Sequence, residues 1–373
     1  MIVFLFMGFR LEIDQTTGAL ERRTLAAKPE NVLKAILFED GPFENYISDH
    51  LPFRDKLLAL YFGSGLSFDF GTDKILVGRK KFLFAKSHDT THNLPILDSY
   101  QNKILFSPDK HQKIVDNLIK IKKLCDENHI RLYILFPPGK DRVYFRYMPS
   151  YILRENRPSP VKQLVALLPP EITVVPIEDL LIQKSLSSPD LLYYKQDTHW
   201  TEDGAFLVYE QLMTYIRQDF PAVKTLAKDD FDVEKRSDVF EPYNNPKTAG
   251  FWGKGSLNLP GRHYDKSLTY NHYTYRDITN IKTEGDVRYS ISVYPRGYPL
   301  KIYMIGDSYA SYLHPYLRAT FQYVHTYRFN PKGEGNWGIH FDDCLKEMQA
   351  DGSDILILSI SDMKLKDLLE PFQ

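Results

Sequence analysis

Two spacings of apolar residues alternate along the chain from about residue 108 onward. One places apolar side chains three or four positions apart, as in Ile114, Leu118, Ile121 and Leu124, and it is typical of an amphipathic helix. The other is a short continuous apolar run, typical of a strand buried on both faces. The pattern predicts helices at residues 110–129, 160–168, 201–217, 309–320 and 341–350, and strands at residues 131–136, 171–176, 301–305, 323–328 and 354–360.

Strands that alternate with helices favour an α/β fold, with helices on both faces of a mostly parallel sheet. We expect this main domain at residues 101–373. Residues 225–298 break the rhythm with several glycines and an Asn-Pro turn, and they indicate a loop-rich insertion. Residues 1–100 form an N-terminal region, in which we expect a short amphipathic helix after Pro52 and two short strands around Gly78.

The first nine residues, MIVFLFMGF, are continuously apolar. A membrane-spanning helix needs about 20 such residues, and the segment lacks the basic flank and cleavage site of a signal peptide. Two interpretations remain open. The segment is the trailing half of a membrane anchor, or it is a short strand or buried terminus.

The charge of the chain excludes one class of function. Lys and Arg number 47 against 48 Asp and Glu, so the formal net charge is -1 and there is no basic field for nucleic acid. The 25 tyrosines suit contacts with sugars, because each ring offers a flat apolar face and a polar hydroxyl, although an aromatic core explains them equally well. Two cysteines, Cys125 and Cys344, do not indicate a disulfide framework.

A serine lies directly after one expected strand and before the next helix. Ser308 follows Gly306 and Asp307, and active sites of such sheets form at the carboxyl ends of the strands. Backbone N–H groups at the start of the helix can stabilise an oxyanion, and Gly306 permits a tight turn and close approach of a substrate. Ser308 is therefore a candidate nucleophile that needs a base. The alternative is that it merely caps the helix.

A candidate base lies in the sequence Asp197-Thr198-His199-Trp200, just before the helix at residues 201–217. A carboxylate two residues from an imidazole can accept its Nδ1–H, which leaves Nε2 able to deprotonate a serine. The alternative is local capping by Asp197 and a packing role for His199. Together with Ser308, the two residues complete the inventory of a nucleophile, a base and an orienting acid.

These motifs resemble those of the alginate O-acetyltransferases of the AlgJ/AlgX type, within the SGNH-hydrolase superfamily. The resemblance covers about residues 41–360. It rests mainly on YYKQDTHWT at residues 193–201, with IGDSY about a hundred residues later. A softer match is FPPGKDRVY at residues 136–144, and the softest are Phe43-Glu44, PFRD at residues 52–55 and the stretch at residues 78–84.

The resemblance implies an SGNH-hydrolase-like three-layer α/β/α fold and an O-acetyltransferase that acts on an extracellular polysaccharide. It implies Ser308 as the nucleophile, His199 as the general base and acid, and Asp197 as the orienting residue, with Asp and His preceding Ser in the chain. It also implies a location in the periplasm or at the extracytoplasmic face of the inner membrane, with an N-terminal anchor. The implied partner is a multispanning membrane O-acyltransferase that supplies acetyl groups.

Other residues are weaker candidates. We expect the backbone N–H groups of Ser308 and Gly306 to form the oxyanion site. Tyr309, Arg328, Asn330 and Trp200 are candidates for substrate binding, and Trp252 and Trp337 for stacking on sugars. The histidines at 314, 325 and 340 lack the spacing of metal ligands. We therefore expect no metal and no cofactor.

Two rival functions share these residues. An esterase would use the same triad, because only acceptor binding and water exclusion separate hydrolysis from transfer. A polysaccharide-binding or assembly subunit would keep the fold without catalysis, but such a subunit has no need of all three triad residues.

Overall fold

The computed structural model describes residues 26–32, 34, 41–50, 75–86, 95–195, 197–236, 269–285, 289–328 and 339–372. The apolar segment at residues 1–9 and the helix expected after Pro52 lie outside these residues, as do Trp252 and Trp337. No helix in the described part of the chain has the length and apolar character needed to cross a bilayer.

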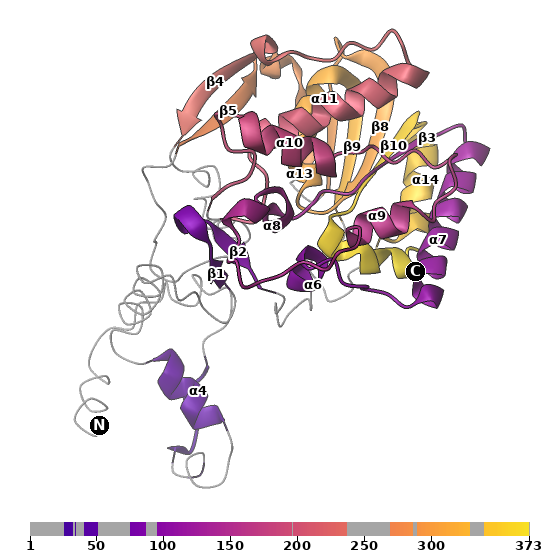
Figure 1. Ribbon diagram of the computed structural model, residues 1–373. Coiled ribbons are helices and arrows are strands. Elements are labelled where there is room, and N and C mark those ends of the chain that lie inside the picture. Colours follow the sequence, from indigo (N-terminus) through magenta and orange to yellow (C-terminus); the bar gives the residue numbers. More distant parts are fainter. Residues whose placement is uncertain are drawn as a thin grey trace.

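The centre of the molecule is a sheet of six strands in the order β3-β10-β8-β9-β7-β6. The first four strands run parallel (Figure 1), and β7 and β6 extend one edge in antiparallel pairing. The strands are β3 (Arg131–Leu135), β10 (Ile355–Ser359), β8 (Tyr298–Gly306), β9 (Phe321–Arg328), β7 (Tyr289–Val293) and β6 (Lys282–Gly285).

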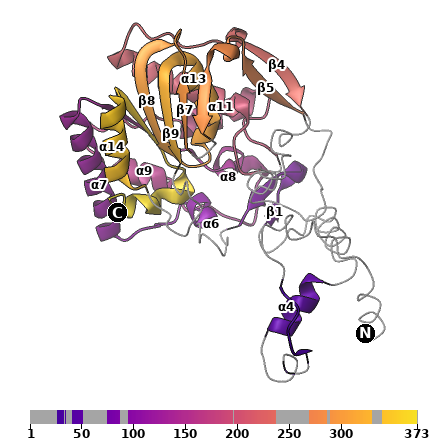
Figure 2. The ribbon, with the colours of Figure 1, turned by 180° about the vertical axis from the view of Figure 1, so that it is seen from behind.

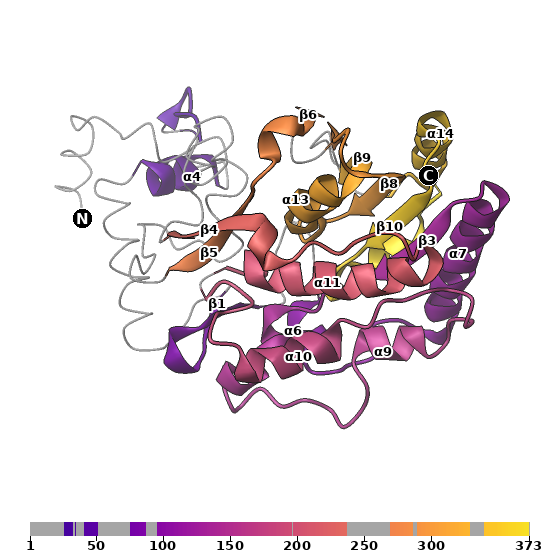
Figure 3. The ribbon, with the colours of Figure 1, turned by 90° about the horizontal axis from the view of Figure 1, so that it is seen from above.

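Helices cover both faces of this sheet, because its strands bury apolar side chains on both sides. In β8, Ile302 and Met304 pack with one cluster while Tyr303 and Ile305 pack with the other, which follows the two-residue period of a strand. Figures 2 and 3 show the sheet between the two helical layers. The first layer holds α10 (Glu178–Ser187), α11 (Glu202–Asp219) and α13 (Ala310–Thr320), and the second holds α7 (Pro108–Glu127), α9 (Pro160–Val165), α14 (Phe341–Asp351) and the 3-10 helix η6 (Asp362–Leu369).

Smaller elements lie around this core. The two strands expected around Gly78 are present as an antiparallel pair, β1 (Ile75–Val77) and β2 (Leu83–Ala85). A second pair, β4 (Phe231–Arg236) and β5 (Tyr270–Tyr275), comes from the region predicted as an insertion. The remaining helices are α4 (Pro42–Asp49), α6 (Ile96–Tyr100) and α8 (Lys140–Val143).

The structure confirms the strands and helices predicted for the sheet, with one exception. The strand expected at residues 171–176 is reduced to a single parallel bridge between Val174 and Ile134. Pro169, Pro170 and Pro176 bracket the segment and lack the N–H groups that longer pairing requires.

The parallel register aligns the ends of four strands, and this alignment positions the site. Ser359 is opposite both Leu135 and Gly306, and Gly306 is opposite Arg328. The segments that leave β3, β8, β9 and β10 therefore start from one edge of the sheet, where ligand sites of such folds form.

Candidate active site

Asp197 and His199 form a buried, hydrogen-bonded pair just ahead of α11. The Nδ1 atom of His199 lies 2.5 Å from Oδ1 of Asp197, and the same oxygen accepts the backbone N–H of His199 at 2.8 Å. Burial alone would raise the pKa of Asp197, but the charge and hydrogen bonds of His199 outweigh it and lower that pKa below 3.8. The carboxylate can therefore hold the Nδ1 proton, which leaves Nε2 as the basic nitrogen.

The loop that carries this pair is fixed at both ends. Thr201 is the N-cap of α11, as predicted, and its Oγ1 accepts the backbone N–H of Gly204 at 3.2 Å. The backbone N–H of Thr201 donates to the carbonyl of Leu192 at 2.9 Å. A Cβ on Gly204 would lie 2.2 Å from that same Leu192 oxygen, so only glycine permits the close approach.

Ser308 lies in the turn between β8 and α13, where Asp307 makes the structural hydrogen bonds. Asp307 is buried, and its carboxylate accepts the N–H groups of Tyr309 at 3.0 Å and Ser361 at 2.9 Å. The N-cap of α13 is Tyr309, with no capping bond from a side chain, so Ser308 does not cap this helix. Its side chain is left for another role.

Tyrosines of the α13 segment dock this turn against the loop of Asp197 and His199. The Tyr309 hydroxyl donates to the carbonyl of Thr198 at 2.9 Å, and its ring centre lies 5.3 Å from that of His199. Tyr312 stacks on the His199 ring at 5.7 Å, with the planes 25° apart. Ser308 is thus adjacent in sequence to a residue in contact with His199. Among the described residues its hydroxyl forms no hydrogen bond with His199, so the complete triad stays a prediction.

The other predicted site residues have different positions. Trp200 is fully buried and Tyr309 is 2% exposed, so their burial indicates packing of the loop rather than direct contact with a polymer. Arg328 ends β9 opposite Gly306, at the edge of the sheet from which Ser308 emerges. Asn330 lies outside the described residues. Within the described chain, no group of three His, Cys, Asp or Glu side chains has a geometry suited to a metal ion.

Lys140 is a residue of this site to which the sequence assigned no role. It is 3% exposed, and its Nζ donates to the backbone carbonyls of Tyr194, Lys195 and Asp197 at 3.1, 3.1 and 2.6 Å. The sequence places Lys140 in the Pro-Pro-Gly-Lys stretch after β3, but it contains no signal for a contact with a loop almost 60 residues later.

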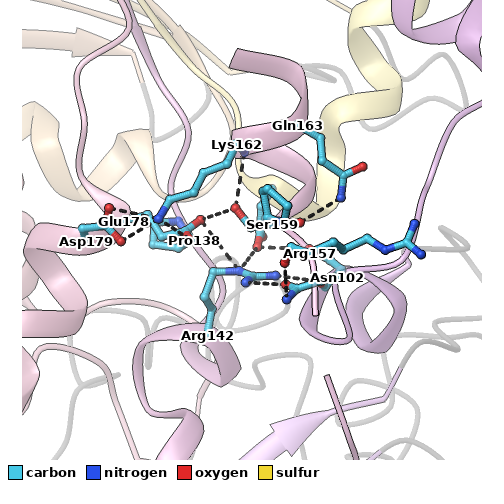
Figure 4. A network of polar contacts seen from close by, with 12 residues as sticks. Asn102, Pro138, Arg142, Arg157, Ser159, Lys162, Gln163, Glu178 and Asp179 are labelled. Carbon is cyan, nitrogen blue, oxygen red and sulfur yellow. Dashed lines mark hydrogen bonds and ion pairs between the residues drawn. The ribbon is translucent and has the colours of Figure 1, made fainter. Parts of the chain in front are cut away.

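A second buried polar network lies beside α8 and is shown in Figure 4. Arg142 donates to Asn102 Oδ1 at 3.0 Å, and its Nε lies 3.8 Å from carboxylate oxygens of both Glu178 and Asp362. Burial, followed by the nearby charge of Asp141, raises the pKa of Asp362 to about 7. The pKa of Asp141 is raised too, chiefly by burial. This network braces the segments that follow β3 and β10.

The family model of the SGNH hydrolase-like domain of the acetyltransferase AlgX matches residues 77–242. This range contains Asp197, His199 and Lys140, while Ser308 lies beyond it. Over these residues the match confirms the resemblance predicted from the sequence, and it supports O-acetyltransferase activity. No curated protein sequence matches the chain.

Two solved structures of Bacillus cereus PatB1 confirm the fold. Bacillus cereus PatB1 with a sulfonyl adduct shares 14% identity over 81% of this chain and 99% of its own, with a TM-score of 0.57. Bacillus cereus PatB1 without that adduct shares 16% over 80% of this chain and 100% of its own, with a TM-score of 0.55. The O-acetyltransferase domain of Pseudomonas putida AlgJ is more distant, with 14% identity over 78% of this chain and 92% of its own and a TM-score of 0.43.

Proposed function

We propose that this chain transfers acetyl groups to hydroxyls of an extracellular polysaccharide through an acyl-enzyme on Ser308. The observation that carries the proposal is the buried Asp197–His199 pair, held against the Ser308 turn by Tyr309. Catalytic hydrogen bonds are often long or absent before substrate binds, so the absence of a Ser308–His199 hydrogen bond among the described residues is compatible with this role.

The proposed reaction has two half-reactions. Nε2 of His199 accepts the Ser308 proton as Oγ attacks the carbonyl carbon of an acetyl donor. The tetrahedral intermediate collapses, the donor alcohol leaves with that proton, and Ser308 keeps the acetyl group as an ester. A sugar hydroxyl then gives its proton to His199 and attacks this ester, and the acetylated sugar departs as the proton returns to Ser308.

Each remaining group has a proposed part in these steps. Asp197 keeps the imidazole oriented and stabilises its protonated form. The backbone N–H groups of Ser308 and Gly306 are the candidates for the oxyanion site. By resemblance to the AlgJ/AlgX type, we place the reaction in the periplasm or on the outer face of the inner membrane, where a membrane O-acyltransferase supplies the acetyl groups.

Covalent labelling tests the nucleophile. The wild-type chain is incubated with an activated acetyl ester or with a sulfonyl fluoride, the latter because a PatB1 structure holds a sulfonyl adduct. Intact-mass spectrometry should show one adduct in wild type and none in Ser308→Ala. Ser311→Ala is the matched control, because Ser311 lies one turn further along α13, and it should be labelled like wild type. An adduct that survives Ser308→Ala would refute the assignment.

A second measurement separates transfer from hydrolysis. Acetylated enzyme is mixed with a neutral or acidic oligosaccharide, and the acetylated sugar and free acetate are both quantified. Transfer predicts acetyl-sugar as the main product. Release of acetate alone, unchanged by added sugar, would favour the esterase.

A further inference from the structure

Lys140 stands out because a buried ammonium ion here has backbone carbonyls as its partners. It is the first residue of α8, and no carboxylate in the described part of the chain lies within 4.0 Å of its Nζ, although Asp197 and Asp141 are near enough to act on its charge. Moving an ammonium ion out of water is costly, so such a side chain persists only where its hydrogen bonds are well satisfied. Burial lowers the pKa of Lys140 to about 7, against the opposing charges of Asp197 and Asp141, so the ammonium form with three donors prevails below about pH 7.

The number and direction of its hydrogen bonds match the ammonium group. A lysine ammonium has three N–H donors, and here they meet the three carbonyls of Tyr194, Lys195 and Asp197. The shortest of these bonds, at 2.6 Å, ends on Asp197 itself. An apolar side chain would avoid the cost of the buried charge but would leave these carbonyls without this donor.

The three carbonyls belong to the segment that delivers the Asp197–His199 pair. This segment folds back on itself, because the backbone N–H of Tyr194 donates to the carbonyl of His199 at 3.1 Å. The carbonyl of Lys195 also accepts a hydrogen bond from the backbone N–H of Leu83 in β2, which connects the segment to that strand. Lys140 therefore binds residues 194–197 of a closed loop, and His199 lies further along the same loop.

We infer that Lys140 is a positioning residue, whose ammonium group fixes the loop of residues 194–199 so that Asp197 and His199 keep the geometry needed to activate Ser308. The part of this inference that concerns Ser308 rests on the proposed function. The part that concerns the His199–Asp197 hydrogen bond stands on the loop contacts alone.

Two readouts test this role in Lys140→Met. The first is the downfield proton NMR signal of the His199 Nδ1–H, assigned by its loss in His199→Gln. It reports the bond to Asp197 without any catalysis. The second is the rate of sulfonylation of Ser308 at a fixed concentration of sulfonyl fluoride. We expect the signal to broaden or vanish and the rate to fall about 100-fold, the scale of a misplacement of about 1 Å at a reacting group.

Arg146→Met is the matched control. Arg146 lies six residues along the chain, and its guanidinium also donates to a backbone carbonyl, that of Ser185 in α10, at 2.6 Å. Its loss should lower stability while it leaves the signal and the labelling rate within about twofold of wild type, because its guanidinium donates to Ser185 and not to the loop of residues 194–199.

The outcomes separate the two proposals. A folded Lys140→Met protein that keeps both the signal and the rate overturns the positioning role. Loss of the signal in Lys140→Met, together with a wild type that is never labelled at Ser308, supports the positioning role and refutes the acyl-enzyme. If Lys140→Met does not fold, Lys140→Gln, which keeps two N–H donors on a shorter side chain, is judged by the same two readouts.

Discussion

Gly306 is the position where a single added carbon should displace the predicted nucleophile. A Cβ there would lie 2.3 Å from Cβ of Ala310, and it would also meet the backbone oxygen of Ser359 at 3.1 Å. Carbon atoms pack at about 3.5 Å or more, so the start of α13 must move by about 1 Å in Gly306→Ala. Ser308 and Tyr309 lie between these two residues and must move with it.

We expect this change to lower the free energy of unfolding by about 1–3 kcal/mol, the usual cost of overpacking. Sulfonylation of Ser308 should slow by about 100-fold, because the reacting group is displaced. Urea unfolding and the labelling rate measure the two effects. Ala310→Gly removes the nearest clashing atom, so the double variant Gly306→Ala/Ala310→Gly should recover most of the rate. A single Gly306→Ala variant with wild-type stability and labelling would refute the reasoning.

Three further changes act at separate points of the site. Asp197→Asn should slow labelling of Ser308 by about 1,000- to 10,000-fold in a folded protein, because the amide favours the wrong tautomer of His199; a rate within tenfold of wild type would contradict this. Thr201→Ala should cost about 0.5–2 kcal/mol in urea unfolding, because the N–H of Gly204 loses its cap; Thr201→Ser serves as the control. The raised pKa of Asp362, about 7 against 3.8, means that the folded state binds more protons across this window, so stability should fall as pH rises from about 4 to 7. In Asp362→Asn the free energy of unfolding should change less between pH 5 and pH 7.5 than it does in wild type. An equal change in both proteins would contradict the prediction.

The sheet was predictable from the sequence because its strands are buried on both faces. Such strands appear as short apolar runs, as in Leu132 to Phe136 and Ile355 to Leu358. The helix α11 was equally clear, since Thr201 marks its start and its apolar face repeats at helical spacing. By contrast, α10 buries only Leu181 and Ser185 fully, so its sequence carries little periodic signal.

The site was predictable only in its local parts. Asp197 and His199 are two residues apart, so their contact follows from the sequence almost directly. The contacts of Lys140 with the loop, and of Tyr309 with Thr198, join segments that lie far apart in the chain. No spacing along the sequence encodes them, because they depend on how the segments that leave β3 and β8 meet the loop before α11.

The hydrogen bond from Tyr309 to Thr198 connects positions 111 residues apart in the chain. The entropy of closing such a long loop grows only with the logarithm of its length, by about 0.6 kcal/mol for each doubling. The intervening chain can therefore gain or lose residues over evolution while the register of β8 keeps both halves in place. During folding, however, the loop of Asp197 and His199 meets the Ser308 turn only when this long-range contact closes, and such contacts slow folding.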